Sequence, residues 1–166
     1  MNLTMIPAGE PVFVDANVFV YDFGPDPVYG PSCNALLKRF EKKDLRGFTS
    51  SLVLHDVAHR AMTVEACQCL GWPYAGIGRR LRNNPAEIQK LTRFRQMLDE
   101  ILAVGVEVIQ VTSNHILLAA DLSRKHGLLS GDALVVAMMQ SNRLVNLASG
   151  DNDFDRVPGI VRYDLL

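Results

Sequence analysis

The amino-acid sequence predicts a three-layer α/β domain in which helices cover both faces of a central, mostly parallel sheet. Short apolar runs alternate along the chain with longer segments whose apolar residues recur at helical spacing. Such alternation is typical of parallel βαβ units, whose right-handed crossovers place helices on both faces of one sheet. With 166 residues, 48% of them hydrophobic, the chain is long enough for one core and too short for two ordinary domains. We therefore expect a single domain over residues 1–166.

Composition limits where the protein is expected to act and which partners its charge can attract. Three cysteines are an odd number, and no charged and then apolar leader begins the sequence, so we expect a cytoplasmic protein without a disulfide framework. No apolar run approaches the roughly 18 residues of a membrane span, and we expect no membrane association. The net charge of −1 gives no overall attraction to a polyanion, so a nucleic-acid partner would have to be bound by local patches.

The first strand is predicted in the apolar run between Val12 and Val20, which also carries Asp15 and Asn17. Asp and Asn are poor strand residues, so we expect them at the C-terminal end of the strand. That end is the edge where open α/β sheets bind ligands. Residues 22–31 are crowded with glycine and proline and are expected to be irregular.

The remaining elements follow from caps, breakers and periodicity. Ser50 or Ser51 is expected to cap one helix and Thr112 or Ser113 another, which Gly127 ends. Residues 63–84 have no clear period and are expected to form an insertion or flap. The predicted helices cover residues 31–40, 52–59, 85–104, 113–126 and 133–139, and the predicted further strands cover 46–49, 106–111, 145–148 and 160–163.

Four carboxylates are expected near the C-terminal edge of this sheet. They are Asp15 at the end of the first strand, Asp56 early in the helix after the second, Asp132 in the first turn of a helix, and Asp151 after the fourth strand. Carboxylates packed together repel, and a hard divalent cation such as Mg²⁺ or Mn²⁺ relieves that repulsion with oxygen ligands. Taken singly, each aspartate also fits a structural role in a turn, a helix terminus or a solvated face.

Four motifs together resemble the PIN-domain ribonucleases, and most of all the VapC toxins of prokaryotic toxin–antitoxin modules. The motifs are Asp15-Ala16-Asn17, Ser50 with an acidic residue six positions on, the segment 129–134 around Ser130 and Asp132, and the segment 149–154. The resemblance implies a PIN-like αβα fold and a Mg²⁺- or Mn²⁺-dependent endoribonuclease with an RNA substrate, a cognate antitoxin and a homodimeric state.

The resemblance also implies roles for individual residues. It assigns catalysis to Asp15, Asp56, Asp132 and Asp151, and metal binding to Asp15, Asp132 and Asp151. It assigns supporting roles, which orient the carboxylates or metal-bound water, to Asn17, Ser130, Ser149 and Asp153. Most family members have Glu where this chain has Asp56, whose shorter side chain reaches less far.

A basic cluster in the middle of the chain is a candidate RNA-binding surface. Arg79, Arg80, Arg82 and Arg93 have few acidic neighbours in sequence and would attract RNA phosphates. A solvated helix face explains the same cluster equally well.

Two rival functions remain open from sequence. Because of Asp56, a catalytically degenerate PIN-like module that binds RNA or a partner is the main alternative. A phosphohydrolase with Asp15 as covalent nucleophile is disfavoured, since the usual second aspartate two residues on is Asn17 here.

Overall fold

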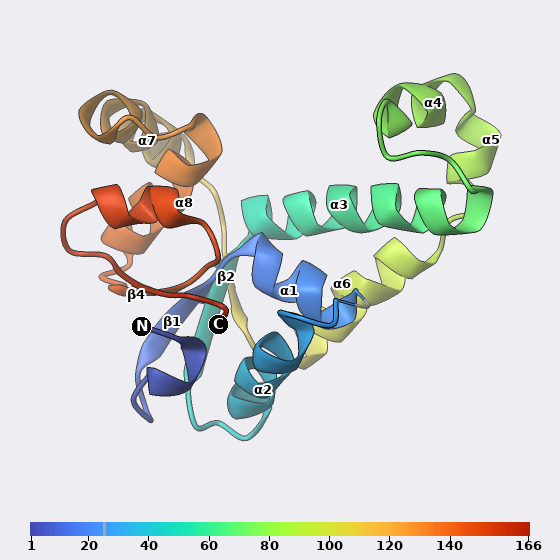
Figure 1. Ribbon diagram of the computed structural model, residues 1–166. Coiled ribbons are helices and arrows are strands. Elements are labelled where there is room, and N and C mark those ends of the chain that lie inside the picture. The colour runs from blue at the N-terminus through green and yellow to red at the C-terminus, as the bar shows by residue number, and fades with distance from the viewer. Residues whose placement is uncertain (25) are drawn as a thin grey trace.

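The computed structural model, which describes residues 1–24 and 26–166, is built on one five-stranded parallel sheet (Figure 1). The strand order is β3-β2-β1-β4-β5, so β1 lies in the centre, with Val12 paired to Gly47 on one side and to Asn146 on the other. All strands point the same way, and their carboxyl ends therefore meet at one edge. The strands are β1 (Pro11–Val14), β2 (Arg46–Ser50), β3 (Glu107–Ile109), β4 (Asn146–Ala148) and β5 (Val161–Tyr163).

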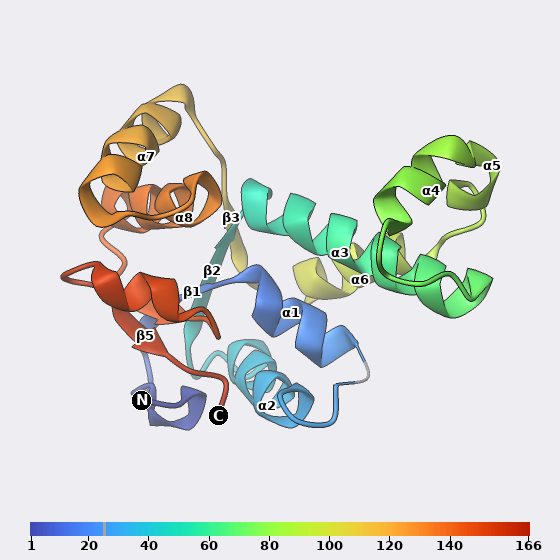
Figure 2. The ribbon, with the colours of Figure 1, turned by 45° about the horizontal axis from the view of Figure 1, so that its top comes forward.

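Helices cover both faces of this sheet, which confirms the predicted three-layer α/β fold (Figures 1 and 2). The helices α7 and α8 pack together on one face, while α1, α2, α3 and α6 cover the other. The α-helices are α1 (Ala16–Phe23), α2 (Gly30–Glu41), α3 (Ser51–Leu70), α4 (Ile77–Asn83), α5 (Pro85–Ile88), α6 (Arg93–Ala103), α7 (Ser113–His126) and α8 (Ser130–Ser141). Two short 3-10 helices, η1 (Leu3–Met5) and η2 (Asn152–Arg156), complete the described elements.

The central strand is as buried as its sequence predicts. Val12, Phe13 and Val14 are completely inaccessible, and so are Val136 and Met139 of α8. Burial on both faces explains why β1 is uniformly apolar instead of alternating. None of the helices in the described part of the chain combines the length and apolar character that crossing a membrane requires.

The segment after β1 corrects the prediction for residues 22–31. The strand ends at Val14, and the chain turns at once into α1, because the Asp15 carboxylate caps the helix by accepting the N–H of Ala16 at 2.7 Å. The prediction of irregular structure was therefore wrong at both ends, since α1 extends to Phe23 and α2 begins at Gly30. Pro25, within this range, lies outside the described residues.

The far end of α3 corrects two further predictions. Residues 63–70 continue α3 for two more turns, and the predicted helix 85–104 is broken into α5 and α6. The break has a cause in Glu65, whose buried carboxylate accepts the N–H groups of Thr92, Arg93 and Phe94 at 2.8–3.0 Å. It thereby caps α6 from a neighbouring helix, a partner that local sequence does not reveal.

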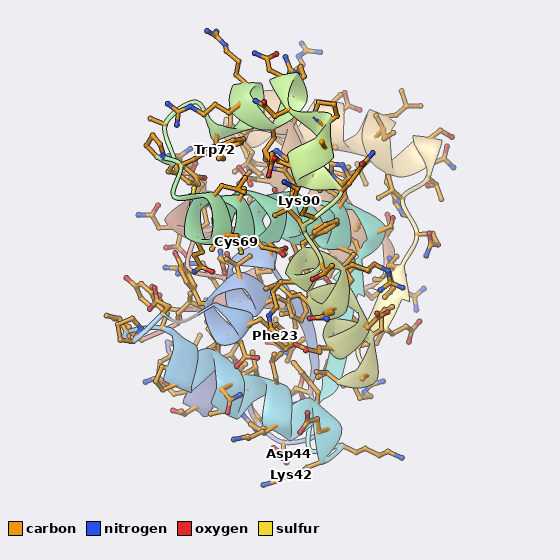
Figure 3. All side chains as sticks on the ribbon, turned by 90° about the vertical axis from the view of Figure 1, so that its right-hand side faces the viewer. Phe23, Lys42, Asp44, Cys69, Trp72 and Lys90 are labelled. Atoms are coloured by element: carbon orange, nitrogen blue, oxygen red, sulfur yellow. The ribbon has the colours of Figure 1, made fainter. Side chains whose placement is uncertain are left out.

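Residues 63–92 form what we call the arm, which stands at the far end of α3 (Figures 1 and 2). Its small core consists of Ala66, Ile77, Leu81 and Leu91, with Trp72 packed against them beneath α4 (Figure 3). That residues 63–84 are an insertion or flap stays a prediction.

Candidate functional site

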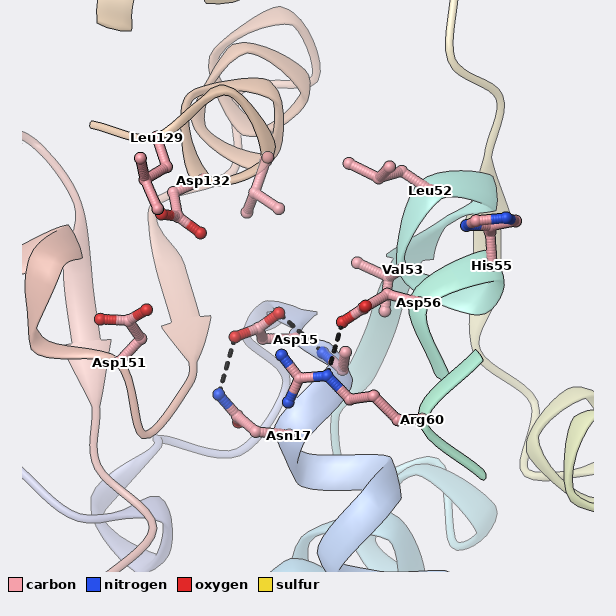
Figure 4. A pocket seen from close by; sticks show the side chains of 13 residues that line it. Asp15, Asn17, Leu52, Val53, His55, Asp56, Arg60, Leu129, Asp132 and Asp151 are labelled. Atoms are coloured by element: carbon pink, nitrogen blue, oxygen red, sulfur yellow. Dashed lines mark hydrogen bonds and ion pairs between the residues drawn. The ribbon is translucent and has the colours of Figure 1, made fainter. Parts of the chain in front are cut away.

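The carboxylate of Asp15 lies at the centre of the candidate site, between the end of β1 and the start of α1 (Figure 4). Its Oδ1 accepts the N–H of Ala16, and its Oδ2 accepts Nδ2 of Asn17 at 2.8 Å and the hydroxyl of Ser149 at 2.7 Å. Three donors thus fix the orientation of one carboxylate. Burial nevertheless raises the pKa of Asp15, although the bonds from Ser149 and Ala16 act in the opposite direction.

Ser149 and Asn17 also connect α1 to the loop after β4. The Ser149 side chain is fully buried, and its oxygen accepts the N–H of Asp151 at 3.1 Å. Asn17 accepts the N–H of Gly150 through Oδ1 at 3.3 Å. This network ties the loop that carries Asp151 to Asp15, although the two are far apart in sequence. The supporting roles of Asn17 and Ser149 stay predictions.

Three of the predicted carboxylates converge on one cavity of about 330 Å³, with the fourth on its wall. Asp15, Asp132 and Asp151 turn toward a common space from α1, α8 and the loop after β4, as Figure 4 shows. Asp56 lines the same cavity from α3. The strand order brings these segments together, since β1 lies between β2 and β4 and their carboxyl ends meet here.

The cavity carries excess negative charge. The pKa of Asp132 is raised to about 6, mainly by burial and then by the neighbouring carboxylates of Asp151, Asp15 and Asp153, in that order of effect. A carboxyl whose pKa lies so close to neutrality marks a place where an added cation would be strongly favoured.

Arg60 is a site residue that the sequence reasoning missed. Its Nε lies 2.9 Å from Oδ2 of Asp56, one helical turn earlier on α3, and its guanidinium reaches back toward Asp15 (Figure 4). This positive charge lowers the pKa values of both Asp15 and Asp132, against the effect of burial. The spacing of four residues between Asp56 and Arg60 was a signal available in the sequence.

The donor set fits a hard divalent cation held partly through water. Most of the side chains that line the cavity with metal-binding atoms are carboxylates, which Mg²⁺ and Mn²⁺ prefer; the others are the amide of Asn17 and the imidazole of His55. Within residues 1–24 and 26–166, no three His, Cys, Asp or Glu side chains lie close enough to hold one ion by themselves. Mg²⁺ commonly binds proteins through one or two carboxylates and keeps several waters, so the spread of these aspartates suits it.

Other predicted residues lie away from the cavity. Asp153 forms an ion pair with Arg156 at 2.8 Å, and Ser130 is exposed in the first turn of α8 without lining the cavity. The arginines of the middle cluster line no part of it: Arg79, Arg80 and Arg82 are exposed on α4, and Arg93 lies 3.6 Å from Glu100 on α6.

Comparison with known proteins identifies the family of this chain. The family model described as PIN domain matches residues 12–160. No curated protein sequence matches the chain.

Three solved structures share the fold at low sequence identity. VapC20 of Mycobacterium tuberculosis, described as a sarcin–ricin loop cleaving toxin, has a TM-score of 0.60 and 17% identity over 90% of this chain and 96% of its own. VapBC2 of Rickettsia felis, bound to a DNA fragment from its promoter, has a TM-score of 0.58 and 16% identity over 93% and 98%. A toxin–antitoxin complex of Klebsiella pneumoniae has a TM-score of 0.56 and 15% identity over 90% and 95%.

Proposed function

The chain belongs to the PIN domain family, and from that premise we propose that it is a metal-dependent endoribonuclease and the toxin of a toxin–antitoxin pair. The observation that carries the proposal is the convergence of Asp15, Asp132 and Asp151 on one cavity, where the pKa of Asp132 rises to about 6. Such a cluster attracts a hard divalent cation, which would also offset the negative charge of an RNA phosphate.

Asp15, Asp132 and Asp151 are the residues that would hold Mg²⁺ or Mn²⁺. A divalent cation bound there supplies a water of lowered pKa and an electrostatic partner for the phosphate. Asn17 and Ser149 keep the Asp15 carboxylate turned into the cavity, because both donate to its Oδ2. In this scheme Ser130 and Asp153 act less directly, Asp153 by adding negative charge beside Asp132.

Asp56 acts by positioning Arg60. The ion pair engages Nε of Arg60, and the terminal nitrogens extend beyond it toward Asp15 (Figure 4). A guanidinium in that position donates to the non-bridging oxygens of a phosphate, as its planar fork is suited to do. Held in this way, the phosphate would lie between the guanidinium and the carboxylates, open to in-line attack by water. The water oxygen bonds to phosphorus, the bond from phosphorus to the 3′-oxygen breaks, and the 3′-oxygen leaves as a hydroxyl that takes up the proton released by the water.

RNA and an antitoxin are the partners that this function requires. A single-stranded or looped RNA suits the site, because its backbone can bend into a cavity at a sheet edge. The VapC20 and toxin–antitoxin complex structures support carrying over RNA cleavage and an antitoxin partner to this chain. We also propose a homodimer and a cytoplasmic location, where RNA and antitoxin are both present.

The arm extends the proposed RNA-binding surface. Arg79, Arg80 and Arg82 are exposed on α4, at the far end of the helix whose first turns carry Asp56 (Figure 2). Their charge would attract an RNA strand that leaves the cavity along α3.

A non-cleaving PIN-like module is the second candidate. It is favoured by the ion pair in which Arg60 engages the carboxylate of Asp56, because that carboxylate would otherwise be free to serve as a fourth metal ligand. Such a module would bind RNA or a partner protein through the same edge without hydrolysis.

An Asp132→Ala variant separates the two candidates. We expect it to lose RNA cleavage in Mg²⁺ and Mn²⁺ while still binding RNA, because the cation loses a ligand and the basic surfaces remain. Asp121→Ala, on the exposed face of α7, is the matched control and should cleave at the wild-type rate. A wild-type protein that binds RNA but cleaves none under either metal would favour the non-cleaving module.

A further inference from the structure

A second cavity, of about 370 Å³, adjoins the carboxylate cavity. The two share Asn17, Arg60 and Asp151 as lining residues, so Arg60 is a basic side chain that borders both cavities. The rest of the second cavity is lined by Tyr21, Tyr29, Gly150, Asn152, Asp164 and Leu165.

A pair of tyrosines forms one wall of this second cavity. Tyr21 lies on α1 one turn after Asn17, and its ring centroid is 4.9 Å from that of Tyr29, with the ring planes tilted by 36°. The turn before Tyr29 is fixed by Asp26, whose Oδ1 accepts the N–H groups of Val28 at 2.9 Å and Tyr29 at 2.8 Å. Both rings are half-buried, so they are supported by the core and still reachable from the cavity.

Arg162 and Ser32 hold in place the C-terminal segment that also lines this cavity. Arg162 donates to Oδ2 of Asp164 at 2.9 Å and to the carbonyl of Ser149 at 3.0 Å, and its side chain is only 12% exposed. The hydroxyl of Ser32 donates to the carbonyl of Leu165, which ties the C-terminal segment to α2. Arg162 also donates to Asp155, from Nε at 2.8 Å and from Nη2 at 3.1 Å, so it offsets only part of the charge of Asp164. Arg60 is a cation that lines this cavity and can meet a phosphate.

We propose that the second cavity binds the nucleotide next to the scissile phosphate, with its base against Tyr21 and Tyr29 and the phosphate at Arg60. The inference rests on the proposed ribonuclease function and names the part of the substrate that this cavity selects. Aromatic rings stack on any base through its π-face, and Arg60, which lines both cavities, offers a guanidinium to the phosphate that connects them. The amide of Asn152 adds a donor and an acceptor that can distinguish one base edge from another.

The experiment combines a protein variant with an altered substrate. The variant is Tyr21→Leu/Tyr29→Leu, which keeps apolar volume but removes both rings. The substrates are three short single-stranded RNAs: one is intact, one has an abasic site on the 5′ side of the cut, and one has an abasic site on its 3′ side. Phe23→Leu is the matched control, since Phe23 lies on the same helix but lines a different cavity with Val64 and Met97.

For wild type and Phe23→Leu, we expect the abasic site on one side of the cut to lower kcat/KM by about tenfold, as loss of one stacked base should. For the double variant, the intact RNA should be cleaved about tenfold less well, and the abasic site should cause little further loss. An abasic penalty of equal size in wild type and double variant would overturn the proposal.

Two further measurements keep the result unambiguous. If the double variant melts well below wild type, Tyr29→Leu and Tyr29→Phe replace it, and only the leucine variant should lose the abasic penalty. Binding of the three RNAs in EDTA, measured by fluorescence anisotropy, separates this proposal from the proposed function. Base-dependent binding without any cleavage would refute the nuclease and retain the subsite, whereas cleavage without base dependence would refute the subsite alone. If the tyrosine variants weaken only the binding of a partner protein, the cavity belongs to that partner and the proposal fails.

Discussion

Asp56 and Arg60 form an ion pair of 2.9 Å, one turn apart on α3, at the wall of a cavity that three other aspartates share. Their side chains are 42% and 48% exposed, so the pair itself adds little to the stability of the fold. Its importance is electrostatic, because Arg60 lowers the pKa values of Asp15 and Asp132 while burial raises them. Arg60 thus partly compensates the negative charge that the fold concentrates at this edge.

Replacing Arg60 with alanine is expected to lower the rate of RNA cleavage by about 100-fold, the scale found when a positioned donor is removed from a developing charge. Arg60→Lys should recover only part of this loss, because an ammonium lacks the planar fork of the guanidinium. Single-turnover cleavage rates test the prediction, with the exposed Arg124→Ala on α7 as control. Equal rates for Arg60→Ala and Arg124→Ala would remove Arg60 from the mechanism.

Asp132 should make the metal-free protein less stable as the pH rises. Its pKa is about 6 in the folded chain, mainly because of burial, against 3.8 for an ordinary aspartate. The folded state therefore binds more protons than the unfolded state between these two values, so this group's contribution to stability is present below about pH 4 and is lost as the pH rises through about 6. In EDTA, the thermal midpoint should fall between about pH 4.5 and pH 7, and this fall should be larger for wild type than for Asp132→Asn. Mg²⁺ at pH 7 should raise the wild-type midpoint more than that of the variant. Identical pH dependence in the two proteins would show that Asp132 does not titrate in this window.

Glu65 is expected to stabilise the arm. Its carboxylate is only 8% exposed and accepts three backbone N–H groups at the start of α6, so Glu65→Ala leaves these donors without their partner. We expect the free energy of unfolding to drop by about 2 kcal/mol, the cost of a lost cap with buried donors. Urea denaturation tests this, with the exposed Glu107→Ala on β3 as control. A loss no larger than that of the control would mean that α6 is held by its apolar face alone.

The arginines of α4 are expected to contribute to RNA affinity through charge. Changing Arg79, Arg80 and Arg82 together to glutamine should weaken binding of single-stranded RNA and reduce the slope of log K against log salt by up to about 2, since each phosphate contact contributes about 0.7. A control triple variant at Lys42, Lys43 and Arg46 removes the same charge near the opposite edge of the sheet. If both triple variants weaken binding equally, net charge and not the arm explains the effect.

Local sequence signals were sufficient to predict most of the fold and to predict that the four aspartates gather at one edge of the sheet. The apolar run before Asp15 predicted the central strand, and the caps at Ser50 and Thr112 were correct because side-chain capping is a local interaction. The four aspartates met because strand ends in a parallel sheet share one edge, which follows from topology alone.

The features that the sequence did not predict depend on contacts between distant segments. Glu65 breaks a predicted helix by capping residues 27 to 29 positions away, and no local pattern reports such a partner. Helix α1 was missed because its apolar residues Val18 and Phe19 continue the composition of β1, and only the cap at Asp15 separates the two elements. Arg60 was not predicted because its role depends on Asp15 and Asp132, which only the fold brings within reach of its charge.

The most direct test of the central claim is cleavage of a mixed single-stranded and structured RNA pool by purified protein, freed of any bound antitoxin, in Mg²⁺, in Mn²⁺ and in EDTA. An Asp15→Asn variant, which preserves the shape of the side chain and removes its charge, is assayed beside it. We expect cleavage that requires a divalent cation and disappears in the variant, with 5′-phosphate and 3′-hydroxyl ends on the products. Cleavage in EDTA, or equal cleavage by Asp15→Asn, would contradict a metal centre built on these carboxylates.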